Sequence, residues 1–79
     1  MRQFQVKFHS LREVHAFVDL CTKQPFQIMV GNDRHQVNAT NFMGLFSLNC
    51  RTPLTVMPDC TEEAYDRFRR EAEMFLVNE

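Results

Sequence analysis

Residues 36–48 constrain the fold most, because they predict the end of a strand, a helix cap and a short helix in direct succession. Val37 and Ala39 alternate with polar neighbours, which is the period of a half-buried strand. Asn41 is a good N-cap, since its side-chain oxygen can accept a backbone N–H of the first turn. The helix that follows is crowded with apolar residues: Phe42, Met43, Leu45, Phe46 and Leu48. A short helix buries only one face, so we expect an exposed apolar cluster here, the usual mark of a contact surface.

Alternation and helical spacing predict the first half of the chain. Residues 2–8 place Phe4, Val6 and Phe8 on one face of a strand. Ser10 can then cap a helix, with Glu13 in the position of a capping box. The expected apolar stripe of this helix consists of Leu11, Val14, Phe17, Val18 and Cys21. The helix should end before Gln24-Pro25, because the residue before a proline avoids the helical region.

The second half continues the same order. The remaining elements are predicted as strands over 26–30, 34–39 and 52–57, a helix over 41–48, a connector over 49–51 and a last helix capped by Thr61. In the strand over 52–57 we expect Leu54 and Val56 to point inward, and the last helix has a stripe of Ala64, Phe68, Ala72 and Phe75. The order β-α-β-β-α-β-α predicts an α+β two-layer sandwich, with a four-stranded sheet, helices on one face and a single domain over 1–79.

Composition narrows the classes of function. A net charge of −1 gives no electrostatic reason to expect nucleic acid or an anionic membrane as a partner. No apolar run reaches the length of a membrane span or a secretion signal. Cys21, Cys50 and Cys60 are odd in number and widely spaced, which favours a reducing cytoplasm over a disulfide framework. Metal-ligand spacing and a glycine-rich phosphate loop are both missing, so we expect neither a metal nor a cofactor.

The stretch over 36–48 also resembles a known family. Val37, Asn38, Met43, Gly44, Ser47 and Leu48 match the segment V-N-x-x-S-I-M-G-V-M-S-L of HPr, the histidine phosphocarrier of the bacterial phosphoenolpyruvate–sugar phosphotransferase system. Phe42, Leu45 and Phe46 are apolar replacements within it. Because the spacing before and after also fits, the resemblance covers nearly the whole chain. It implies the open-faced sandwich with a mainly antiparallel sheet, and a protein of the bacterial cytoplasm.

The family's phosphorylated histidine lies at the N-terminus of the first helix, in a G-I-H-A-R-P-A motif. Free helix N–H groups and the helix dipole stabilise the phosphoryl dianion there, and the arginine adds a charge-assisted contact. Threading without gaps back from Met43-Gly44 puts Ser10 at the histidine position, retains Arg12, and replaces the proline by Glu13. In this register the carrier histidine is absent. A phosphoserine ester is stable, so Ser10 could hold a regulatory phosphate but could not relay one.

Two other registers stay open for a phosphorylatable histidine. His9 is one residue early, and a shift at the strand–helix junction could bring it to the helix N-terminus. Val14-His15-Ala16 mimics the I-H-A of the motif, but this register removes about a turn and a half from the first helix. The bland interpretation is that His9 ends a strand and His15 faces solvent.

Two further family features can be carried over. A regulatory serine at the start of the middle helix maps to Asn41, which keeps the capping role and lacks the phosphorylatable hydroxyl. The apolar surface that docks Enzyme I, sugar permease domains and regulators maps to Phe42, Met43 and Phe46, with Met43 the residue most expected to be exposed. Burial of Phe46 in the core is the competing interpretation.

The sequence leaves three functions open. The first is a degenerate HPr-like protein that acts as a regulatory or protein-binding module. The second is an active phosphocarrier that accepts a phosphoryl group from Enzyme I on His9, assisted by Arg12. The third is a structural domain unrelated to phosphotransfer, favoured if Phe42 and Phe46 are buried. None of the three is a stand-alone catalyst, and we expect the chain to be a monomer or a weak homodimer.

Overall fold

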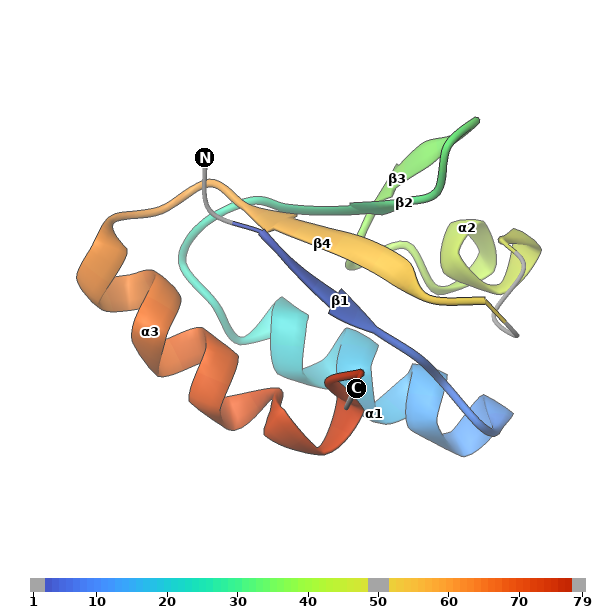
Figure 1. Ribbon diagram of the computed structural model, residues 1–79, viewed down its shortest axis with the longest axis horizontal. Helices are drawn as coiled ribbons and strands as arrows, with labels where there is room; N and C mark the ends of the chain where they lie inside the picture. The colour runs from blue at the N-terminus through green and yellow to red at the C-terminus, as the bar shows by residue number, and fades with distance from the viewer. Residues whose placement is uncertain (1–2, 49–51, 78–79) are drawn as a thin grey trace.

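The computed structural model describes residues 3–48 and 52–77 of the chain. Its elements are β1 (Phe4–Val6), α1 (Leu11–Thr22), β2 (Ile28–Gly31), β3 (Gln36–Asn38), α2 (Phe42–Ser47), β4 (Leu54–Pro58), α3 (Glu62–Glu71) and the 3-10 turn η1 (Glu73–Phe75) (Figure 1). This order confirms the predicted β-α-β-β-α-β-α succession. The connector predicted over 49–51, which includes Cys50, lies outside the described residues.

The strands form one sheet with the order β1-β4-β2-β3, in which every neighbouring pair is antiparallel. Figure 1 shows α1 and α3 side by side under one face of this sheet, while the opposite face is open. Leu54 and Val56 of β4 point toward the helices and are fully buried, as predicted. The α+β open-faced sandwich is therefore confirmed.

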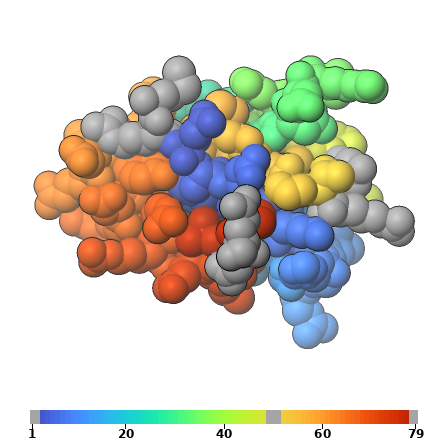
Figure 2. All heavy atoms as spheres, viewed as in Figure 1, coloured from blue at the N-terminus to red at the C-terminus, as the bar shows by residue number. Residues whose placement is uncertain are grey.

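The strands are shorter than the alternating pattern predicts. β1 covers only Phe4–Val6, and its outer edge pairs with the end of the chain rather than with another strand. Val6 forms an antiparallel bridge with Leu76, and the Lys7 N–H donates to the Phe75 carbonyl at 3.0 Å. The pairing with Leu76 and Phe75 covers a strand edge that would otherwise present free backbone groups. In Figure 2 the atoms of α3 also lie directly against those of β1.

Phenylalanine rings join the two long helices to the sheet. The Phe17 side chain of α1 is fully buried and its ring contacts those of Phe8, Phe68 and Phe75, at centroid distances of 5.2, 6.4 and 5.4 Å. Phe68 of α3 is also fully buried and reaches the ring of Phe4 in β1 at 5.8 Å. A connected group of aromatic rings therefore lies within the core, between the two long helices and the sheet.

The predicted apolar stripe of α1 is wrong at one residue, Leu11. Val14, Phe17, Val18 and Cys21 are buried as expected, but Leu11 is 50% exposed. Leu11 is the first residue of the helix, and it lines an open depression together with Arg12 and His15. The predicted apolar stripe therefore begins one turn too early, because periodicity does not show where along a helix the core begins.

Gly31 gives the first test of this architecture. A Cβ atom at Gly31 would lie 2.5 Å from the His35 carbonyl oxygen and 3.0 Å from Gln36 Cα, so backbone atoms of the β2–β3 turn would have to move. We expect Gly31→Ala to lower the free energy of unfolding by about 1–3 kcal/mol, measured by urea denaturation. Gly44→Ala is the matched control. Its nearest contacts are at 3.0–3.2 Å, and alanine raises helix propensity, so a smaller change is expected. Equal stability of Gly31→Ala and wild type would contradict this packing.

Candidate functional site

The N-terminus of α1 is capped by its own side chains. Ser10 is the N-cap, with extended backbone, and its Oγ accepts the Glu13 N–H at 3.3 Å. The Glu13 carboxylate reaches back and accepts the His9 N–H at 3.1 Å. In the capping box the glutamate would bond the N–H of the cap residue itself, so here it reaches one residue further. A carboxylate therefore lies at the helix end where the resemblance implies a phosphoryl group.

The residues considered for phosphotransfer line two different depressions. Ser10 and Arg12 line one of them, next to Leu11 and His15. His9 is exposed and lines another, together with Lys7 and the C-terminal residues Met74, Leu76 and Val77. The structure thus brings Arg12 together with Ser10 and His15, while His9 lies beside the C-terminal segment.

The start of α2 has the predicted cap and an exposed apolar face. The Asn41 Oδ1 accepts the Gly44 N–H at 3.0 Å, which confirms Asn41 as the N-cap. Met43 is 69% exposed and Phe46 55% exposed, whereas Phe42 is half-buried against the core. Leu45 and Leu48 are buried. The prediction that part of this helix lies on the surface is confirmed, and the competing prediction that Phe46 belongs to the core is wrong.

One specific contact between α1 and α2, a stack of two aromatic rings, was not predicted from the sequence. The His15 ring stacks on the Phe42 ring, with centroids 4.2 Å apart and planes at 25°. The Phe42 ring is nearly parallel to that of Phe46, at 6.1 Å and 8°. We call His15, Phe42 and Phe46 the aromatic column. Together with exposed Leu11 and Met43, the column forms the α1–α2 surface. The sequence showed His15 four residues after Leu11, hence on one side of α1, but gave no sign of its partner in α2.

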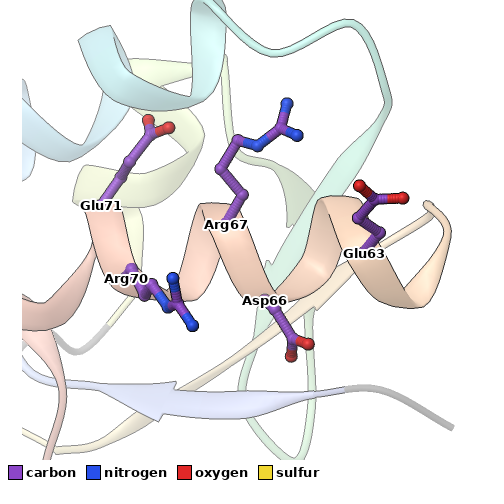
Figure 3. Close-up of a pocket in the computed structure, with 5 residues that line it drawn as sticks. All are labelled: Glu63, Asp66, Arg67, Arg70 and Glu71. Carbon is purple, nitrogen blue, oxygen red and sulfur yellow. The ribbon is translucent and has the colours of Figure 1, made fainter.

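The outer face of α3 holds another depression, which carries charges of both signs (Figure 3). Glu63, Arg67 and Glu71 project from one side of the helix, and Asp66 and Arg70 from the other. Acidic and basic side chains four residues apart are typical of a solvated helix face. We therefore assign no binding role to this depression.

The described part of the chain holds neither a metal-ligand cluster nor a membrane-spanning helix. Within residues 3–48 and 52–77, no three His, Cys, Asp or Glu side chains are grouped so that they could hold a metal ion. In the same ranges no helix has the length and apolar character that a membrane crossing requires.

Cys21 has a strongly altered thiol. It lies on the buried face of α1, and burial raises its pKa from 9.0 to about 12, because a thiolate there would be desolvated. At neutral pH this thiol is protonated and unreactive, which supports a structural role.

Alkaline pH should destabilise the fold through Cys21. Because the pKa is raised in the folded state, the unfolded chain loses this proton first. The contribution to stability is complete below about pH 9 and is lost as the pH rises toward 12. We expect the free energy of unfolding of wild type to fall more steeply between pH 9 and 11 than that of Cys21→Ala, measured by urea titration. Parallel curves for the two proteins would contradict the assignment.

Two solved structures share this fold. The crystal structure of HPr-C-His from Thermoanaerobacter tengcongensis matches with a TM-score of 0.72 and 23% sequence identity, over 91% of this chain and 90% of that chain. The histidine-containing phosphocarrier protein of a Mycoplasma matches with a TM-score of 0.65 and 13% identity, over 94% and 98% of the two chains. Neither the scan against protein-family models nor the search of curated proteins found a match. The chain thus has an HPr-like fold with a strongly divergent sequence.

Proposed function

We propose that this chain with an HPr-like fold is a regulatory protein-binding module that no longer carries a phosphoryl group. The observation that carries the proposal is the capping of the α1 N-terminus by Ser10, with the Glu13 carboxylate beside it. The Glu13 N–H is already bonded to Ser10 Oγ, and the His9 N–H to the Glu13 carboxylate. A phosphoryl dianion that accepted the Glu13 N–H would displace its bond to Ser10 Oγ and would face the negative charge of Glu13.

The positions of His9 and Arg12 support the same proposal. A phosphocarrier using His9 needs a cation beside the phosphoryl group, and the resemblance assigns this task to Arg12. Arg12 and His9 line different depressions. A phosphoryl group on His9 would instead share its depression with Lys7 and apolar C-terminal residues. The separation of His9 from Arg12 between two depressions favours a binding module over a phosphocarrier that relies on this pair.

The α1–α2 surface supplies the binding function. One of its exposed apolar side chains, Leu11, begins α1, and α2 contains no charged residue. A few well-placed apolar and aromatic anchors account for most of the affinity in small interfaces. By resemblance, the partners are Enzyme I-like proteins or sugar-permease and regulatory domains of the bacterial cytoplasm. The free thiol of Cys21 fits a reducing compartment.

A competition assay tests this function. Enzyme I and phosphoenolpyruvate phosphorylate an active HPr, and the chain is added in molar excess. We expect HPr phosphorylation to slow because the chain occupies the docking site of Enzyme I. Glu63→Gln, on the distant charged face of α3, is the matched control and should slow the reaction equally. An unchanged rate with folded wild-type chain would contradict docking to Enzyme I.

A further inference from the structure

We infer that His15 is a positioning residue of the α1–α2 surface. Its ring holds Phe42, and through Phe42 the exposed Phe46, in a fixed orientation before a partner binds. The inference rests on the proposed function, since it assigns to His15 a role in the same docking surface. It gives His15 a role without requiring that its imidazole carry a phosphoryl group.

The geometry of the aromatic column supports this role. The stack of His15 on Phe42 joins two helices, whereas the contact of Phe42 with Phe46 lies within α2. A centroid distance of 4.2 Å at 25° brings the imidazole face onto the phenyl face. Phe46 is 55% exposed, and its ring lies nearly parallel to that of Phe42. The His15 ring therefore restricts the Phe42 ring in addition to the core packing, and the Phe42 ring in turn restricts that of Phe46.

The fold itself does not depend on this imidazole. His15 is exposed, while α1 is anchored by the buried side chains of Val14, Phe17 and Val18. α2 is anchored independently by buried Leu45. Removing the imidazole should thus free the rings of Phe42 and Phe46 without unfolding either helix. Side chains that are already ordered lose less conformational freedom on binding, so a preorganised column binds more tightly.

Two substitutions at this position separate positioning from charge or hydrogen bonding. His15→Ala removes the ring, whereas His15→Phe keeps a ring that can stack on Phe42. With Enzyme I as the binding probe in calorimetry, we expect His15→Ala to weaken binding roughly three- to tenfold. His15→Phe should bind within about twofold of wild type, and so should Asp19→Ala, a control on the same helix. Wild-type affinity of His15→Ala, or equal loss in His15→Phe, would overturn the inference.

A measurement on the free protein keeps this test independent of the partner. In NMR spectra we expect cross-peaks between His15 and Phe42 ring protons in wild type. In His15→Ala the cross-peaks between the Phe42 and Phe46 ring protons should weaken, a change that loss of the imidazole ring current alone would not produce. Unchanged Phe42–Phe46 cross-peaks in His15→Ala would overturn the positioning role. If wild type does not bind Enzyme I while these cross-peaks weaken as expected, the docking proposal fails and the positioning inference stands.

Discussion

Replacement of Phe17 by alanine is expected to lower the free energy of unfolding by about 3–5 kcal/mol, the largest loss that we expect from a single substitution here. Phe17 is fully buried, and its ring contacts three other phenylalanine rings from β1's continuation, α3 and η1. Alanine would leave a cavity at the point where both long helices meet the sheet. Domains of this size are stable by only about 5–15 kcal/mol, so this loss would remove a large share of the total stability. Urea denaturation followed by circular dichroism measures the loss.

The control for this prediction lies on the opposite side of the same helix. His15→Ala removes an exposed side chain and is expected to change the free energy of unfolding by no more than about 1 kcal/mol. A loss below about 1 kcal/mol for Phe17→Ala, or equal losses for the two variants, would show that the described core packing is wrong.

The second large effect concerns binding. We expect Met43→Glu combined with Phe46→Glu to abolish competition with HPr for Enzyme I, a loss of at least about thirtyfold in affinity. The two side chains are 69% and 55% exposed, so they supply apolar contact area to a partner while contributing little to the core. Two carboxylates would be desolvated in the interface without a partner charge.

The double variant should remain folded, with a thermal midpoint close to that of wild type. Folding is checked by circular dichroism before the competition assay, so that loss of binding is not confused with loss of structure. Full competition by a folded double variant would contradict docking through the α1–α2 surface, and would direct attention to another face of the chain.

Local patterns were sufficient to predict the order of elements. Alternation identified the buried faces of β1 and β4, and the caps Ser10, Asn41 and Thr61 all lie where the sequence placed them. Strand ends were less accurate because they depend on long-range pairing. β1 ends at Val6, where its outer edge pairs with Leu76, and no local signal reports a partner so far along the chain.

The α1–α2 surface was predicted only in part, because local patterns reveal an exposed apolar helix but not its contacts with a second helix. An excess of apolar residues in a short helix correctly indicated that some of α2 is exposed, and Met43 is its most exposed member. The stack of His15 on Phe42 joins residues of two helices, so periodicity within either helix could not reveal it. The bond of Glu13 to His9, one residue beyond the expected capping box, depends on how the chain leaves β1.

The absence of carrier chemistry is the central claim, and intact-mass spectrometry tests it most directly. The chain is incubated with phosphoenolpyruvate and a bacterial Enzyme I, with an active HPr in the same tube as the positive control. We expect HPr to gain one phosphate while this chain stays at its unmodified mass. A gain of one phosphate that is lost in acid would contradict the claim, because it would indicate a phosphohistidine. Abolition of that gain by His9→Ala, but not by Ser10→Ala, would then identify His9 as the acceptor.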